Sequence, residues 1–367
     1  MVNVVRVAGV DPGTKSFDVC GLENGKLILA QQIPTKKILK NPDLLIKTLK
    51  NYNFDLIVGP SGYGLPLTQL NKTSRYEIFK LSLIKPSDKK LKPQIGLRNV
   101  LLKLKNSGLN VYMIPSVKHL PTIPTHRKIN KVDMGTADKV CCAALAIQNQ
   151  AKHYNLTYQE TSFILVELGF GYNAFLAVEK GKIVDGIGGT LSHIGFLSQG
   201  FFDGELAYLL GRITKPMLSM GGAAFIAGMR KPDPEKFMEK IDKNKRFSLA
   251  WEAYLEGIEK DVLILKASIK NPKEILVSGR FVKIEKAYKE ISSRLSSYGK
   301  VRKLEGFTFK VKEAAQGAAL IADGLAGGKY KNLVECMKIK KAKGSFLDYI
   351  YQANIKKLSK MFYEDMV

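Results

Sequence analysis

The residues best suited to chemistry stand in a short turn near the start of the chain, DPGTKS at positions 11–16. Gly13 permits backbone conformations closed to other residues, so that successive N–H groups can face one anion. Thr14 and Ser16 add hydroxyl donors, and Lys15 adds a mobile positive charge. Asp11, at the end of an apolar segment, suits hydrated Mg2+. The turn therefore predicts a phosphate-binding loop with a magnesium ion beside it.

A second turn of the same kind follows 156 residues later, with Glu167 at the position of Asp11. It supplies Gly169, Gly171 and Asn173, and the Glu-x-Gly-Lys pattern of positions 23–26 recurs at 179–182. Each copy is typical of three strands joined by two turns. Chance similarity between ordinary hairpins is the alternative. We interpret the chain as two related halves whose turns clasp phosphates and bring both acids near one metal ion.

The elements that must position these turns alternate along the chain. The pattern predicts helices over 42–52 and 97–107, strands over 54–58 and 109–114, and a long surface excursion between. A further helix over 136–152 precedes the second hairpin, and a long amphipathic helix carrying Trp251 precedes a strand over 274–277. This is an α/β layout.

Other polar residues stand in loops or at helix starts. His126, Arg127 and Asp133 precede the helix over 136–152, and Asp138 lies in its first turn, where a carboxylate also favours the helix dipole. For Asp138, capping and catalysis both remain open. His193 stands in a glycine-rich segment that either approaches a ligand or merely connects elements.

Two segments near the end carry small residues. Ser278, Gly279 and Arg280 follow the predicted strand directly, a placement where backbone passes close to a base or ribose. The Ala-rich helix over 313–325 predicts very close packing against another helix or a ligand. Positions 329–367 are interpreted as a basic linker followed by an amphipathic helix.

Composition limits the function classes. The 367 residues carry 58 Lys and Arg against 33 Asp and Glu, a net charge of +25 that would attract polyanions. No basic stretch carries the interleaved aromatic residues of a single-strand platform, so nucleic acid is possible but not favoured. The four cysteines show no metal-ligand spacing, and no apolar stretch is long enough to span a bilayer. We expect a cytoplasmic protein with no membrane partner.

The ordered motifs resemble those of the acetate and sugar kinase, heat-shock and actin superfamily, most closely its butyrate and acetate kinase branch. The chain is similar in particular to an archaeal family described as predicted butyrate kinases. The resemblance implies two ribonuclease-H-like (actin-like ATPase) domains flanking a nucleotide cleft, at 1–153 and 154–328, and a homodimer.

The resemblance also implies roles for residues. Positions 11–14 resemble the first phosphate motif, and 165–171 with 180–185 the second phosphate hairpin. Positions 275–280 resemble the adenosine strand and turn, with Ser278, Gly279 and Arg280 at the nucleoside, and Glu313 and Gly317 lie on the adenosine-side helix. Arg127 stands where this branch places an arginine that contacts the substrate phosphate.

Three positions depart from the branch pattern. Glu167 replaces a histidine, Asp18 replaces a lysine of the first motif, and Arg280 stands in a turn that usually reads Gly-Gly. Glu167 adds negative charge beside a transferring phosphoryl group. Nucleotide binding tolerates these changes better than carboxylate specificity does.

The sequence therefore predicts an ATP- and Mg2+-dependent kinase that transfers the γ-phosphoryl group to a small acceptor, with a short-chain carboxylate such as butyrate as the candidate. Asp11, Glu167 and Arg127 are its predicted catalytic residues. The alternatives are an ATP-binding or ATP-hydrolysing regulatory or RNA-associated assembly protein of the same fold, and a scaffold that no longer binds nucleotide.

Overall fold

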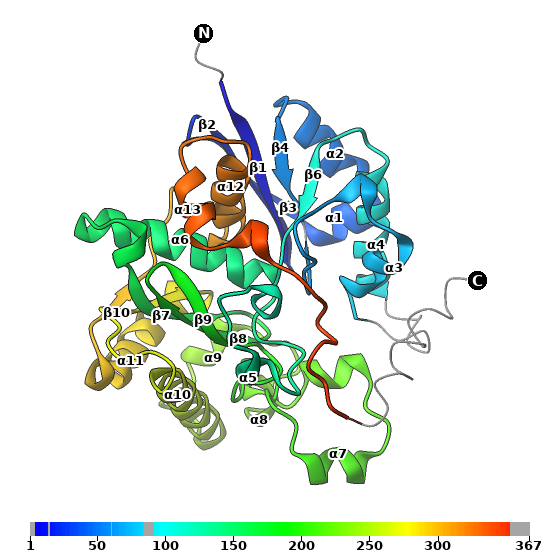
Figure 1. Ribbon diagram of the computed structural model, residues 1–367. Helices are drawn as coiled ribbons and strands as arrows, with labels where there is room; N and C mark the ends of the chain where they lie inside the picture. Colours follow the sequence, from blue (N-terminus) through cyan, green and yellow to red (C-terminus); the bar gives the residue numbers. More distant parts are fainter. Residues whose placement is uncertain (1–3, 14, 60, 84–91, 353–367) are drawn as a thin grey trace. The chain divides into compact units, whose positions relative to one another are not determined.

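The computed structural model describes residues 4–13, 15–59, 61–83 and 92–352 (Figure 1). The chain divides into two compact units. Unit 1 comprises residues 1–132, 136–159 and 305–367, and unit 2 comprises 133–135 and 160–304. Unit 1 is therefore built from segments that precede and follow unit 2 in the sequence, whereas unit 2 is formed almost entirely by one continuous segment.

Unit 1 is built on a six-stranded sheet in the order β3-β2-β1-β4-β6-β5. Strands β1 to β3 form an antiparallel meander, β4 and β6 continue parallel to β1, and the short β5 closes the edge antiparallel to β6. The bounds are β1 Arg6–Pro12, β2 Ser16–Glu23, β3 Lys26–Pro34, β4 Leu56–Val58, β5 Thr68–Gln69 and β6 Val111–Met113.

Helices cover both faces of this sheet (Figure 1). Ala8 and Val10 point from β1 into a core shared with helices α1, α2 and α4, whereas Gly9 faces α12. A Cβ atom on Gly9 would lie 2.3 Å from the Ala315 carbonyl oxygen, so α12 rests directly on the strand. The helices of unit 1 are α1 Thr35–Lys40, α2 Asp43–Lys50, α3 Arg75–Lys80, α4 Lys92–Lys105, α5 Thr125–Lys128, α6 Ala137–Tyr154, α12 Glu313–Leu325 and α13 Lys331–Cys336.

Unit 2 is built on a five-stranded sheet in the order β11-β10-β7-β8-β9. Its core packs the sheet against α10 and α11, with the Trp251 ring stacked on Tyr254 and Phe281. The strands are β7 Ser162–Leu168, β8 Asn173–Glu179, β9 Lys182–Ile187, β10 Glu274–Gly279 and β11 Val301–Lys303. The helices are α7 Gly204–Leu210, α8 Ala223–Ile226, α9 Pro234–Met238, α10 Lys245–Lys266 and α11 Glu285–Leu295.

The predicted repeat is present in the backbone of both units. The Gly13 N–H donates to the Ser16 carbonyl at 2.9 Å, and the Gly169 N–H donates to the Tyr172 carbonyl at 3.1 Å. Both hairpins then use a tight turn with two positive φ angles, at positions 24–25 and 180–181. The second strands share an irregularity, after residue 21 in β2 and after residue 177 in β8. The two hairpins therefore share the closing hydrogen bond, the tight turn and the strand irregularity at corresponding positions.

The units divide the chain differently from the segments predicted from sequence. Helix α12 packs on β1 and α6 and so belongs to unit 1, because its small residues allow very close contact: a Cβ on Gly317 would lie 1.8 Å from the Cys141 carbonyl oxygen. The predicted linker contains α13, whose Leu333 and Val334 are buried. Residues 346–349 form turns instead of the predicted helix, and residues 353–367 lie outside the described residues.

Across the described ranges, none of the helices combines the length and the apolar character needed to cross a membrane.

Candidate functional site

The turn between β1 and β2 places its acid at the end of a buried strand. Asp11 is 8% exposed and pairs across the hairpin with Asp18, which is fully buried. Ser16 donates its hydroxyl to Asp18, and Lys15 stands exposed at the tip of the turn. Thr14, a predicted phosphate ligand, lies outside the described residues. Antiparallel pairing thus brings two carboxylates to one end of the sheet.

A lysine from the far end of the chain neutralises these acids. The Lys312 Nζ lies 2.9 Å from Asp11 Oδ2 and 3.8 Å from Asp18 Oδ1, and the Lys312 N–H donates to Asp18 Oδ2 at 2.8 Å. Burial raises the pKa of Asp11, and the Lys312 charge opposes that change. Burial alone would lower the pKa of Lys312, but Asp11 and Asp18 outweigh it and raise that pKa. The ammonium therefore stays charged.

Asp138 adds a third acid to this end of unit 1. It lies in the first turn of α6, where Thr136 donates to it and the Lys139 ammonium approaches to 2.8 Å. Burial acts to raise the pKa of Asp138, but Lys139 and the Thr136 bond outweigh it, so the pKa lies below its ordinary value. The Asp138 charge in turn acts on Asp11. Asp138 is thus held ionised near the turn.

The turn between β7 and β8 keeps the same backbone with different chemistry. Glu167 is half-buried and lies opposite Ala174, so no second carboxylate faces it across the hairpin. The amides of Leu197 and Ser198 donate to the Gly171 carbonyl. Asn173 is buried, accepts a bond from the Tyr254 hydroxyl at 2.9 Å and donates to the Ile194 carbonyl at 3.3 Å. The Asn173 carboxamide therefore links the end of the turn to Tyr254 and to the Ile194 carbonyl.

The predicted adenosine turn lies beside this second turn within unit 2. Strand β10 runs parallel to β7, and the Arg280 N–H donates to the Leu168 carbonyl at 2.7 Å. Gly279 has a φ of 95°, and a Cβ there would collide with Leu168. The Arg280 guanidinium lies 5.7 Å from the Phe170 ring centre, and its buried Nε has no hydrogen-bond partner among the described residues. Ser278 is buried under the same edge.

His193 belongs to a histidine–aspartate pair. Its Nδ1 lies 2.8 Å from Asp261 Oδ1, and its N–H donates to Asp261 Oδ2 at 2.9 Å. Asp261 is 1% exposed, whereas a quarter of the His193 side chain is exposed. Because a carboxylate only accepts, the hydrogen of this bond is carried by Nδ1. The pair lies next to the residue whose carbonyl holds Asn173.

The predicted acceptor-side residues lie in a short helix of unit 1. In α5, His126 is exposed and Arg127 is half-buried. The buried Lys118 donates to the Phe346 carbonyl at 2.8 Å, and burial lowers its pKa to about 8. Lys128 donates to the Leu120 carbonyl at 2.9 Å. Lys118 therefore ties the segment before α5 to Phe346, whereas Lys128 holds α5 to the chain just before it.

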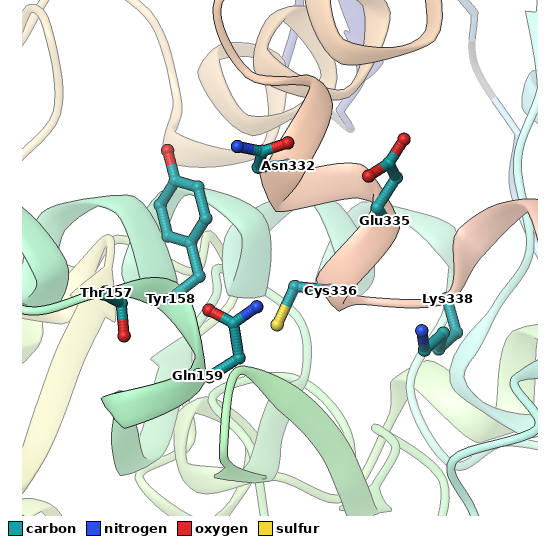
Figure 2. A pocket seen from close by; sticks show the side chains of 7 residues that line it. All are labelled: Thr157, Tyr158, Gln159, Asn332, Glu335, Cys336 and Lys338. Carbon is teal, nitrogen blue, oxygen red and sulfur yellow. The ribbon is translucent and has the colours of Figure 1, made fainter.

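A pocket of about 440 Å3 also lies within unit 1 (Figure 2). Tyr158 and Gln159 line it from the segment after α6, and Asn332, Glu335 and Cys336 line it from α13. None of the predicted site residues contributes to its wall. This pocket is therefore separate from the turns described above.

A cation of the chain itself lies beside Asp11. The Asp11 carboxylate is engaged by the Lys312 ammonium, which supplies the positive charge there. Within the described ranges, no three His, Cys, Asp or Glu side chains are grouped so as to hold an ion. The shared magnesium ion of Asp11 and Glu167 stays a prediction.

Comparison with solved structures defines the fold class. The chain is similar to a propionate kinase from Francisella tularensis subsp. tularensis SCHU S4, with 13% identity, a TM-score of 0.61, and coverage of 85% of this chain and 98% of that one. It is also similar to acetate kinase from Entamoeba histolytica, with 14% identity, a TM-score of 0.58, and coverage of 81% and 87%. At these identities the likeness establishes the fold, and the predicted actin-like ATPase fold class is confirmed.

Sequence comparison places the chain within a family. The model of the family described as "Protein of unknown function (DUF1464)" matches residues 9–352, and the chain belongs to this family. A search of the curated proteins gave no match. Membership of the butyrate kinase branch and an archaeal source stay predictions.

Sequence reasoning missed Lys312 and Asp261. Lys312 stands 301 residues from Asp11, and Asp261 stands 68 residues from His193, so no local spacing joins either pair. One signal was available, since a lysine directly before the Ala-rich helix stands at its N-cap, where a cation is unfavourable unless acids surround it.

Proposed function

We propose that the protein is an ATP-dependent phosphotransferase of the acetokinase-like type, which transfers the γ-phosphoryl group to a small acceptor. One observation carries the proposal: an acid followed by a glycine turn occurs in the same backbone conformation in both units, on a fold shared with acetate and propionate kinases. Ordinary hairpins have no need to share an acid at the end of the first strand.

The residues have distinct proposed roles. In unit 1, Gly13, Lys15 and Ser16 bind phosphate oxygens through N–H, ammonium and hydroxyl groups. In unit 2, Gly169 and Gly171 offer backbone amides. The nucleoside lies against Ser278, Gly279 and Arg280, where the flat guanidinium stacks on the base. Glu313 and Gly317 belong to unit 1, and Gly317 is needed for helix packing, so their predicted nucleoside contacts have the weakest support.

The acceptor proposed is a short-chain carboxylate such as butyrate. Its oxygen attacks the γ-phosphorus, a new O–P bond forms, the bond to the β-phosphate oxygen breaks, and ADP leaves with that electron pair. Arg127 would neutralise the charge that develops on the acceptor side. A carboxylate is already ionised at neutral pH, so this reaction needs no general base. A homodimer and a cytoplasmic location complete the proposal and rest on the resemblance.

The test combines binding with product formation. Calorimetry with ATP should show binding to the wild-type protein and at least tenfold weaker binding to Asp11→Asn, since loss of a charge-assisted contact costs about 1.4 kcal/mol or more. Hydroxylamine should trap an acyl phosphate from ATP and one member of a panel of fatty acids. ATP binding with no trapped product from any acid would remove the carboxylate acceptor and leave the nucleotide site.

The charge balance favours a second candidate, an ATP-hydrolysing assembly protein that contacts RNA. The net charge of +25 supports a polyanionic partner. Co-purifying RNA that stimulates ATP hydrolysis would support this candidate, and an unchanged hydrolysis rate on addition of RNA would argue against it.

A further inference from the structure

Lys312 is bound to the first turn through both its main-chain N–H and its ammonium group. Its main-chain N–H donates to the buried Asp18 at 2.8 Å, and its ammonium donates to Asp11 at 2.9 Å and to the Ser16 carbonyl at 3.3 Å. A surface lysine with one carboxylate partner would keep its rotamer freedom. Three bonds at two ends of the residue instead fix where the ammonium lies.

That position is the centre of the turn. A Cβ atom on Gly13 would lie 1.9 Å from Lys312 Nζ, so the ammonium occupies the space directly against the glycine. The carboxylates behind it are closed off, at 10% side-chain exposure for Asp11 and 0% for Asp18, whereas 34% of the Lys312 side chain is exposed. Lys312 therefore has buried acids on one side, and a third of its side chain is exposed to solvent.

We propose that Lys312 is the resident cation of the first phosphate turn: its ammonium takes the place of a metal ion beside Asp11 and contacts a phosphate of the nucleotide directly. This inference rests on the proposed function for the identity of the ligand. The Asp11 and Asp18 charges hold the ammonium in place and do not themselves touch phosphate. As a consequence, the first turn binds phosphate without a divalent ion.

The same charges predict what happens when the lysine is removed. Asp11 and Asp18 would lose the cation that lies against both of them, and two carboxylates with water complete the ligand set of a weakly held ion. Carboxylates left without a countercharge attract a divalent ion. A neutral residue at position 312 should therefore convert a metal-independent turn into a metal-binding one.

The experiment uses the full chain with Lys312→Met, which keeps the length of the side chain and removes its charge. Lys310→Met, on the same loop with an exposed side chain, is the matched control. ATP binding is measured by calorimetry with EDTA and with Mg2+, and Mn2+ binding without nucleotide is followed by electron paramagnetic resonance. In EDTA, we expect Lys312→Met to bind ATP about tenfold or more weakly than wild type, with part of the loss recovered in Mg2+.

The Mn2+ measurement separates this inference from the proposed function. Without nucleotide, we expect Lys312→Met to bind one Mn2+ ion that wild type and Lys310→Met do not bind, even if no variant binds ATP. Unchanged ATP affinity of Lys312→Met in EDTA would overturn the inference. The inference would also be overturned if the wild type binds an Mn2+ ion and Asp11→Asn does not. This comparison does not require Lys312→Met to fold.

Discussion

In unit 1, two carboxylates and an ammonium lie together at the turn after β1, whereas in unit 2 the turn after β7 carries one carboxylate, and backbone amides donate to its Gly171 carbonyl. The hydrogen bond that closes each turn and the irregularity in each second strand fall at corresponding positions. Asp18, which lies opposite Asp11, corresponds to Ala174, which lies opposite Glu167. The comparison indicates that a duplicated backbone was kept while the charge was concentrated in one copy.

The largest effect expected concerns the strand beneath the turn. Gly9 corresponds to Leu165 in β7, and a Cβ on Gly9 would lie within 2.6 Å of the α12 backbone at three atoms. Because backbone cannot move aside cheaply, Gly9→Ala should destabilise the protein by about 4 kcal/mol. Urea unfolding measures the change. Gly171→Ala, whose Cβ meets nothing within 4 Å, is the control. Equal stability of Gly9→Ala and wild type would show that α12 does not lie on β1.

We expect acid pH to lower the stability of unit 1 through protonation of His119. This residue is 3% exposed, and burial lowers its pKa to about 4. The positive charges of Lys128, Lys118 and Lys80 also lower this pKa, whereas the negative charge of Asp348 opposes them. The unfolded chain takes up the proton near the ordinary pKa of 6.5, so stability is present above pH 6.5 and is lost as the pH falls toward 4. The loss should be roughly 3 kcal/mol.

Two probes report the units separately in this acid titration. All four cysteines are buried in unit 1, and Trp251 is buried in unit 2. Corrected for the smaller thiolate fraction at acid pH, thiol labelling should accelerate as the pH falls below 6, before the tryptophan fluorescence changes. His119→Gln should flatten the pH dependence, and replacement of the exposed His153 should not. A pH dependence that survives in His119→Gln would assign it to other groups.

Matched substitutions of the two acids test where the chemistry is concentrated. Asp11→Asn loosens Lys312 and should lower the rate of phosphoryl transfer by about 100-fold, or about 2.7 kcal/mol. Glu167→Gln should lower it by about tenfold or less, because Ala174, and not a second carboxylate, lies opposite that acid in the hairpin. Steady-state kinetics of ADP release give both values. Equal losses would mean that both turns carry the same chemistry.

Matched substitutions of the two glycines give the smallest effect. Gly13→Ala pushes the end of the Lys312 side chain away and brings its Cβ within 2.9 Å of the Ser16 carbonyl oxygen, so it should cost about 1–2 kcal/mol of stability and weaken ATP binding about tenfold. Gly171→Ala should change ATP affinity by less than about twofold, since its Cβ enters open space. If Gly13→Ala binds ATP as wild type does, the ammonium is not needed at that position.

The sequence predicts features set by local chemistry and misses contacts between distant segments. The hairpins follow from the spacing of acid, glycine and Asn24-Gly25, because these residues dictate turns whatever surrounds them. The close packing of the Ala-rich helix follows from its small side chains. The strand on which α12 packs does not follow, since many apolar surfaces accept such a helix. Lys312 reaches Asp11 only because α12 returns to β1, so the site depends on tertiary structure.

That return of α12 to the first strand also constrains how the chain matures. During translation, the first sheet leaves the ribosome with Gly9 and its neighbours uncovered, and the helix that covers them follows about 300 residues later. The segment 160–304 is complete before that helix emerges. We therefore expect unit 2 to fold first on the ribosome. Until α12 is made, the sheet of unit 1 should stay partly open and expose an apolar surface to which chaperones bind.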